Sequence, residues 1–346
     1  MPPMVYLSGP PGTGKTVVLL LVAMEWLRCG HHVYIVSVWS ESHVACIMLY
    51  HLLLQTISTQ QTAGVTGVTA GHLHLLQYEF KATGGKDVDK AVNELSQAAN
   101  GRPLYVIADE MSTDNFVFFF NKLLMQVPRL HFWAASCYHI MIPGAWSSEF
   151  LTRPLRCPPV VVREVEKDKK IAQHQFVQPY TQRGIPDHTD GPPVKVLYHR
   201  PFQDDHSPTH PADCVTCGRE VASFLHSLRV GLPETVTSTT TPTPPCLQWR
   251  DVMVVYWREE SADPRMVTGL RAGGVAARLM TDDDMEDVAT ARSDVVWVGE
   301  GHRMQGLERK VVVCVDLGDV AARRFRAMSR CTSQLVIVKL DSSHGH

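Results

Sequence analysis

Short apolar runs alternate with longer amphipathic stretches along the first half of the chain. Runs typical of strands cover residues 4–7, 32–38, 104–108 and 130–135, and stretches typical of helices cover residues 16–29, 42–56, 87–99 and 114–126. Nearly continuous apolar strands separated by helices predict a parallel sheet that is covered on both faces.

The second half of the chain repeats this pattern. Strands are predicted at residues 194–198, 251–256, 294–298, 311–315 and 335–339, and helices at 217–228, 264–272 and 320–328. Residues 233–245 read PETVTSTTTPTPP, a composition that cannot pack a core and predicts a flexible surface insertion. We therefore predict an α/β protein with two domains, residues 1–148 and 149–346, each built on a mostly parallel sheet with helices on both faces.

Composition agrees with a globular chain of this kind. Of 346 residues, 45% are hydrophobic, and a length of this size favours two domains. The net charge of −2 argues against a tight, non-specific nucleic-acid binder but leaves room for a local basic groove. No segment reaches the roughly 18 apolar residues of a membrane span, so no membrane partner is expected. Nine scattered cysteines favour reduced thiols and an intracellular location, cytoplasmic or nuclear.

A phosphate-binding loop follows the first predicted strand. The pattern GxxxxGK[ST] is complete in Gly9, Pro10, Pro11, Gly12, Thr13, Gly14, Lys15 and Thr16. An apolar run before it and a helical run after it supply the strand–loop–helix setting that such a loop requires. Backbone N–H groups and the helix N-terminus would hold phosphate oxygens, Lys15 would reach the β- and γ-phosphates, and Thr16 would hold Mg²⁺.

The predicted strand at residues 104–108 ends in two carboxylates, Asp109 and Glu110. This is the Walker B arrangement, in which Asp109 would hold Mg²⁺ through water and Glu110 would polarise the water that attacks ATP. Both ATP and Mg²⁺ are therefore the expected cofactors.

Together with these two motifs, the end of the chain resembles the superfamily 1 helicases, especially their UvrD/Rep-like branch and the helicase-like regions of Schlafen-type proteins. Residues 301–308 (GHRMQGLE) are similar to motif V of that family. The resemblance implies that Gly306 permits a close backbone approach and that Glu308 binds the nucleotide. It also implies two RecA-like lobes that enclose ATP between them.

Two arginines match family motifs that stabilise the γ-phosphate. Residues 327–337 are similar to motif VI, which makes Arg330 an arginine finger, and residues 155–158 are similar to motif IV, which makes Arg156 a second γ-phosphate contact. Arg153 is a close competitor of Arg156. The resemblance places both catalytic arginines in the second lobe. Positive charge at these positions would stabilise the negative charge that spreads over the phosphate during hydrolysis.

Several positions depart from the family pattern. His139 stands where a glutamine that senses the γ-phosphate is usual, and residues 37–43 depart from the nucleic-acid-contacting motif Ia. The chain begins too close to Gly9 for an upstream adenine-reading motif, so we expect it to be one domain of a larger protein or a shortened sequence. These departures suggest weaker hydrolysis or weaker coupling.

Aromatic and basic side chains near predicted strand ends are candidates for nucleic-acid contacts, although most side chains of these types are core or solvated. The aromatic and imidazole candidates are Trp39, Tyr138, Trp146, Trp257 and His302, of which we favour Trp146 and His302. The basic candidates are Lys122, Arg129, Arg258, Arg271 and Arg303.

Residues 205–217 contain a possible zinc knuckle, which we do not favour. Its ligand types are supplied by Asp205, His206, His210, Cys214 and Cys217. The histidine pair precedes the cysteine pair, which reverses the usual finger order, and Cys217 leads directly into an apolar helix, so zinc is not expected. Residues 71–74 (Gly-His-Leu-His) have no partner nearby, and we assign them to loop and core.

The sequence thus predicts an ATPase of helicase type that moves along or remodels single-stranded DNA or RNA. Two alternatives stay open. One is a nucleotide-gated switch that exposes a surface to a protein partner. The other is an RNA-binding defence or regulatory module with little hydrolysis. Fused domains are compatible with each of these hypotheses.

Overall fold

A computed structural model of the chain describes residues 2–63, 69–80, 85–111, 115–137, 144, 146–167, 171, 180, 190–201, 206, 210–231, 247–257, 264–318 and 320–341. The chain divides into two compact units. The first unit comprises Met1–Arg156, Lys169–Pro186 and His302–Leu307, and the second comprises Cys157–Asp168, Asp187–Gly301 and Glu308–His346.

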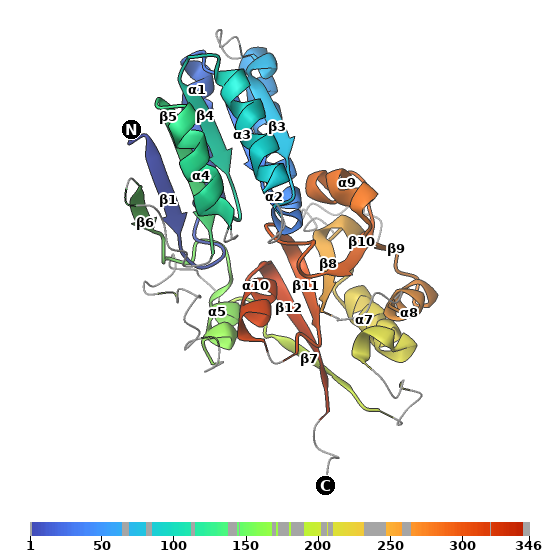
Figure 1. Cartoon of the computed structure of the whole chain (residues 1–346). Helices are drawn as coiled ribbons and strands as arrows, with labels where there is room; N and C mark the ends of the chain where they lie inside the picture. Colours follow the sequence, from blue (N-terminus) through green and yellow to red (C-terminus); the bar gives the residue numbers. More distant parts are fainter. Residues whose placement is uncertain are drawn as a thin grey trace. The chain divides into compact units, whose positions relative to one another are not determined.

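The first unit is a six-stranded sheet in which every neighbouring pair is parallel (Figure 1). The strands lie in the order β3-β2-β4-β5-β1-β6. Their bounds are β1 Met4–Ser8, β2 Val33–Ser37, β3 Leu73–Gln77, β4 Leu104–Ala108, β5 Leu130–Ser136 and β6 Ser147–Phe150. The helices of this unit are α1 Lys15–Arg28, α2 Ser40–Thr62, α3 Lys86–Ala99 and α4 Asn115–Gln126.

Alternation along the strands divides the core of the first unit into two layers. Val5 and Leu7 of β1 face the layer that contains Leu19 of α1 and Leu49 of α2. Tyr6, between them in the sequence, faces the other layer, which α3 and α4 cover. Because successive strand residues point to opposite faces, an entirely apolar strand is buried on both sides. This double coverage makes the ends of the strands the accessible edges of the sheet.

The second unit has the same construction, again with parallel pairing throughout and the strand order β7-β12-β11-β8-β10-β9. Its strands are β7 Lys195–His199, β8 Val252–Tyr256, β9 Ala277–Leu279, β10 Val296–Glu300, β11 Arg309–Val315 and β12 Cys331–Leu340. Its helices are α5 Pro159–Glu166, α7 Val215–Ser227, α8 Met266–Ala272, α9 Met285–Thr290 and α10 Ala321–Met328. Helices α7 and α8 cover one face of this sheet.

The predicted fold class is confirmed: two parallel sheets carry helices on their faces, as in two RecA-like lobes. The predicted boundary after residue 148 falls inside β6, which pairs with β1. The predicted insertion at 233–245 lies outside the described residues. None of the described helices combines the length and the apolar character that a membrane crossing requires.

Trp146, favoured above as a nucleic-acid contact, belongs to the core of the first unit. The side chain is 8% exposed and its ring packs against Phe116, Phe120 and Phe132 with centroid distances of 5.7, 4.9 and 5.4 Å. A ring surrounded in this way has no open face on which a base could stack, so the structure contradicts the favoured assignment.

We therefore expect Trp146→Ala to lower the free energy of unfolding by about 3–5 kcal/mol, the usual range for a buried large aromatic. Trp146→Phe should retain most of the stability because it keeps an aromatic ring in the cluster. Urea unfolding followed by circular dichroism measures both variants. An unchanged unfolding midpoint for Trp146→Ala, combined with weaker binding of single-stranded nucleic acid, would restore the stacking hypothesis.

Candidate nucleotide site

The predicted phosphate-binding loop connects β1 to α1 and depends on glycine backbone conformations. Gly9, Gly12 and Gly14 have φ values of 144°, 78° and 92°, in the region that only glycine adopts readily. At Gly9 a Cβ atom would lie 1.9 Å from the carbonyl oxygen of Leu151, so a side chain is also excluded by space. The pattern of glycines in the sequence is thus required by the shape of the loop.

Lys15 is buried within this loop. Its Nζ donates hydrogen bonds to the carbonyl oxygens of Gly9 at 2.7 Å and Pro10 at 2.8 Å. Burial lowers the pKa of Lys15, while the nearby Asp109 and Glu110 act in the opposite direction. Among the described residues, the hydrogen bonds of this ammonium group go to two carbonyl oxygens of its own loop, and an anion would be a stronger partner.

The positive charge of Arg156 contributes to lowering the pKa of Lys15, which indicates that Arg156 belongs to the same site. The next residue toward the N-terminus, Leu155, donates its N–H to the carbonyl oxygen of Gly12 at 2.9 Å. Arg156 belongs to the first compact unit, whereas the resemblance placed it in the second lobe. Arg156 is half-buried and its competitor Arg153 is exposed, which favours Arg156 as the arginine of this site.

Asp109 joins the phosphate-binding loop to the end of β4. The Thr16 hydroxyl donates to Asp109 Oδ2 at 2.7 Å, and the backbone N–H of Glu110 donates to Oδ1 at 2.9 Å. Burial and the adjacent charge of Glu110 raise the pKa of Asp109 to about 6. A hydroxyl and a carboxylate in contact are oxygen ligands of the kind Mg²⁺ prefers, and a cation would favour the ionised carboxylate. The residues present therefore fit a magnesium ion.

Glu110 is held in an unusual backbone conformation, with φ of 53°. Its carbonyl oxygen accepts the indole N–H of Trp39 at 2.9 Å, and its carboxylate Oε2 accepts the side-chain N–H of Gln305 at 2.9 Å. Left-handed backbone in a residue other than glycine costs free energy and persists where surrounding contacts hold it. These contacts aim the carboxylate, which is 9% exposed.

Gln305 was not singled out from the sequence, although it lies inside the quoted segment 301–308. The side chain is 1% exposed, and residues His302–Leu307 belong to the first compact unit. Gly306 has φ of 86°, and a Cβ there would lie 2.4 Å from the Cβ of Ala45 on α2. The glycine therefore permits the close approach that brings Gln305 to Glu110. In the sequence, the signal for Gln305 was that it is a polar residue immediately before Gly306.

The remaining site candidates lie elsewhere or outside the described residues. Arg330 and Glu308 belong to the second unit. Arg330 occupies the turn between α10 and β12, is 4% exposed, and donates its backbone N–H to the carbonyl oxygen of Ala327. His139 lies outside the described residues. The structure thus brings together the phosphate-binding loop, both Walker B carboxylates and Arg156 within one unit.

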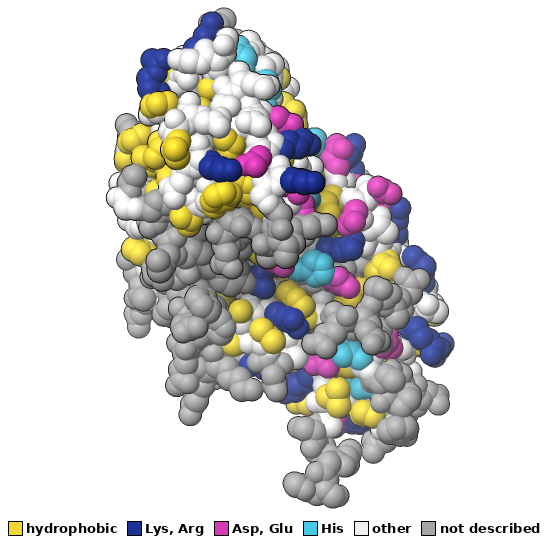
Figure 2. All heavy atoms as spheres, viewed as in Figure 1, with side chains coloured by type: hydrophobic (Ala, Val, Ile, Leu, Met, Phe, Trp, Pro, Cys, Tyr) yellow, Lys and Arg dark blue, Asp and Glu magenta, His cyan; other side chains and the backbone are white. Residues whose placement is uncertain are grey.

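Most nucleic-acid candidates that the structure describes have structural partners. Trp39 bonds the Glu110 backbone, Lys122 forms an ion pair with Asp89, and Arg129 donates to a backbone carbonyl oxygen. Tyr138 and Arg258 lie outside the described residues. On the face drawn in Figure 2, described Lys and Arg side chains are interspersed with Asp and Glu side chains. This mixture agrees with the small net charge.

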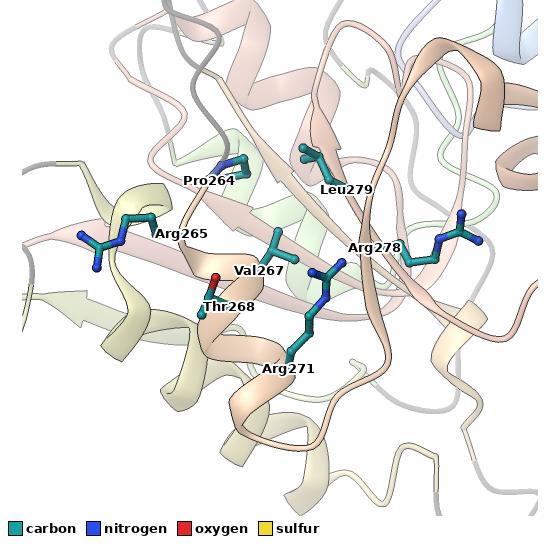
Figure 3. A pocket seen from close by; sticks show the side chains of 7 residues that line it. All are labelled: Pro264, Arg265, Val267, Thr268, Arg271, Arg278 and Leu279. Atoms are coloured by element: carbon teal, nitrogen blue, oxygen red, sulfur yellow. The ribbon is translucent and has the colours of Figure 1, made fainter.

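An arginine-rich pocket of about 300 Å³ lies beside α8 and β9 in the second unit. Its lining residues are Pro264, Arg265, Val267, Thr268, Arg271, Arg278 and Leu279. Figure 3 shows the head groups of Arg265 and Arg278 pointing away from each other, and the Arg271 Nε donates to the Ala277 carbonyl oxygen. Since the three cations do not converge, we assign no anion to this pocket.

No protein-family model matches the sequence, and no curated protein matches it significantly. Solved structures with a similar fold include the arterivirus nonstructural protein 10 helicase (11% identity, TM-score 0.39, 99% of this chain and 60% of that chain) and its complex with DNA (12%, 0.40, 99% and 61%). The Pyrococcus furiosus Hef helicase domain is similar at 10% identity and a TM-score of 0.36, over 99% and 93% of the two chains. The chain thus spans about three fifths of the arterivirus helicase chains.

The raised pKa of Asp109 predicts a specific pH dependence of stability in magnesium-free buffer. The pKa of Asp109 is about 6 in the folded protein and 3.8 as its ordinary value. Between these two pH values the folded state therefore binds more protons than the unfolded state. The stability that protonated Asp109 contributes is full below the lower value and is lost as pH rises through about 6. At about pH 7.5 the free energy of unfolding of Asp109→Asn should therefore exceed that of wild type by roughly 1–3 kcal/mol. This difference should shrink toward about pH 4.

Urea titrations at several pH values measure this difference. Asp283→Asn, at an exposed carboxylate, is the matched control and should follow wild type. A difference between Asp109→Asn and wild type that did not change with pH would contradict the role assigned to burial of Asp109.

Gln305→Ala should slow any ATP turnover by this site while leaving nucleotide affinity nearly unchanged. A hydrogen bond to a charged group contributes about 1.5–3 kcal/mol, which corresponds to a loss of roughly ten- to a hundredfold in kcat. Gln334→Ala, which removes another buried glutamine whose amide bonds the Pro193 carbonyl oxygen, is the control for loss of a buried amide. Equal effects of the two substitutions on kcat would indicate a general structural cause.

Proposed function

We propose that this chain binds ATP with Mg²⁺, hydrolyses it, and uses the reaction to move along or remodel single-stranded nucleic acid. The observation that carries the proposal is the 2.7 Å hydrogen bond from the Thr16 hydroxyl to Asp109. It joins the last residue of a phosphate-binding loop to a carboxylate 93 positions away in the sequence. Both groups are Mg²⁺ ligands in P-loop NTPases.

Each group at this edge of the first sheet has a role in that reaction. Backbone N–H groups of the loop and the N-terminus of α1 would hold phosphate oxygens, and the Lys15 ammonium would leave its loop carbonyls for the β- and γ-phosphates. Bound Mg²⁺, held through Thr16 and Asp109, would supply positive charge. Glu110 would take a proton from the attacking water, with Gln305 orienting its carboxylate.

Positive charge from arginine completes the arrangement. Arg156 lies close enough to Lys15 to perturb it electrostatically, so it would stabilise the charge that spreads over the γ-phosphate. Arg330 is proposed as the arginine finger on the strength of its motif alone.

The use of ATP on nucleic acid is supported by the resemblance of the ordered motifs to superfamily 1 helicases. The near-neutral charge argues for a local path for the strand, in which a few stacked bases supply affinity. DNA and RNA would both fit such a path, because aromatic stacking reads neither sequence nor sugar.

A second candidate function is a nucleotide-gated switch. The specific observation that favours it is the engagement of both key side chains: Lys15 bonds loop carbonyls and Glu110 accepts from Gln305. ATP would then rearrange these bonds and expose a surface to a protein partner, with little turnover. Such a switch would bind ATP, and nucleic acid would not stimulate its turnover.

The steady-state ATPase rate with and without single-stranded DNA and RNA separates the two candidates. For the motor we expect nucleic acid to raise the rate at least about tenfold, equivalent to roughly 1.4 kcal/mol of barrier. Lys15→Ala and Arg330→Ala should both abolish the stimulated rate. Slow turnover that ignores nucleic acid, in protein that binds ATP, would refute the motor and support the switch.

Matched controls keep the assay specific. Lys90→Ala removes an exposed lysine of α3, and Arg323→Ala removes a half-buried arginine of α10, the helix that precedes Arg330. Both variants should retain the wild-type rate and its stimulation.

A further inference from the structure

Four side chains of metal-ligand type converge in the second unit. They are His199, His206, Cys214 and Cys217, and one ligand atom from each lies within 4.8 Å of all the others. None of the four is more than 7% exposed. They come from three separate segments of the chain: the last residue of β7, residue 206, and the N-terminal end of α7.

Three of the distances between these atoms are close to those of a tetrahedral metal site. The Nδ1 of His199 lies 3.2 Å from the Sγ of Cys217, and the Nδ1 of His206 lies 3.4 Å from each of the two sulfur atoms. With zinc–sulfur bonds of about 2.3 Å and zinc–nitrogen bonds of about 2.0 Å, tetrahedral geometry separates sulfur from nitrogen by about 3.5 Å. The cluster therefore needs only small adjustments to accept an ion at its centre.

The surroundings of the cluster orient its sulfur atoms and imidazoles. The backbone N–H of Cys217 donates to the Sγ of Cys214 at 3.4 Å. The outward Nε2 of His206 lies 3.6 Å from the carboxylate of Glu220 on α7. A carboxylate on the second nitrogen of a ligating histidine is a common outer partner in metal sites, where it fixes the ring and raises its basicity.

Position in the fold distinguishes His199 from an ordinary core residue. β7 is an edge strand whose first four residues are exposed or half-buried, yet His199 is fully buried. An imidazole buried against two thiols at the end of an exposed strand contributes little apolar packing. Binding of a cation would account for its burial there.

We propose that His199, His206, Cys214 and Cys217 bind one structural zinc ion. Two thiolates with two imidazoles in tetrahedral geometry are a zinc donor set, and four protein ligands leave no open position for a catalytic water. The ion would tie the edge strand β7 to the N-terminus of α7. This inference does not depend on ATP hydrolysis.

The sequence paired His206 with His210, whereas the structure groups His206 with His199. His210 lies apart from the cluster in its interactions: its Nδ1 accepts the N–H of Ala212 at 3.1 Å, and its Nε2 lies 3.3 Å from Asp316. His199 supplies the fourth ligand from a strand 15 positions before Cys214, a spacing outside the finger pattern. The two histidines still precede the two cysteines, but this set is formed by tertiary structure and does not follow the finger pattern, so it is judged by its geometry.

Metal analysis of the full chain, purified without chelators, tests the proposal. We expect one zinc per chain in wild type and almost none in Cys214→Ala and His206→Ala. The matched controls are Cys314→Ala, at a fully buried cysteine of β11, and His210→Ala. Both controls should retain one zinc, and the histidine pair identifies which imidazole is the ligand.

Cobalt(II) substitution of wild-type protein gives a second readout that needs no variant to fold. Tetrahedral coordination by two thiolates should give intense visible bands and a thiolate-to-cobalt charge-transfer band, which added zinc should abolish. A zinc content unchanged in Cys214→Ala and His206→Ala would overturn the proposal. So would wild-type protein that binds neither metal, or in which Cys214 and Cys217 are recovered as a disulfide.

Discussion

Two carboxylates and one ammonium group are withdrawn from water at the carboxyl ends of β4 and β1, and the local structure of the first unit serves to hold them there. Ionised groups of this kind are unfavourable in a protein interior unless they are paired or hydrogen-bonded. Asp109 is satisfied by a hydroxyl and a backbone N–H, Glu110 by an amide, and Lys15 by two carbonyl oxygens. These hydrogen-bond partners are neutral, while the charges of Lys15, Asp109 and Glu110 also act on one another. Under the proposed function, phosphate would add a partner for the ammonium and a divalent cation would add one for the carboxylates.

The same physical requirement operates in the second unit with different chemistry. There the buried polar groups are two imidazoles and two thiols, grouped around His206 near the end of β7. Neutral thiols and imidazoles can be buried at moderate cost, but grouping four of them at tetrahedral distances buries little apolar surface in return. A cation converts the same grouping into four strong bonds, which suits an edge strand that has one neighbour in its sheet.

The sequence predicted the fold well because the central strands of both sheets are apolar on both faces. Runs such as residues 104–108 and 311–315 are recognisable without knowledge of their neighbours. β3 escaped prediction because its burial pattern is mixed: Leu73 is buried, Gln77 is exposed, and residues 71–74 were assigned to loop and core. β6 escaped for a related reason, since all four of its residues are exposed and only pairing with β1 defines it.

Sequence motifs could not predict contacts between residues that are far apart in the sequence. Gln305 and Glu110 are 195 positions apart, and nothing in either segment signals the other. His199 had no ligand-type neighbour at finger spacing, so its partnership with Cys217 depends on how β7 and α7 fold together. For Gln305 and for His199, the residue type suits the contact, but only the tertiary structure shows which residue of that type makes it.

The path of the chain around Gln305 connects the candidate site to the second sheet through covalent bonds. Residues His302–Leu307 belong to the first unit, while Gly301 and Glu308 on either side belong to the second. β10 ends at Glu300 and β11 begins at Arg309, so two strands of the second sheet lead directly into and out of this segment. Under the proposed function, a change in the hydrogen bond between Gln305 and Glu110 during hydrolysis would reach β10 and β11 within a few residues of the same chain.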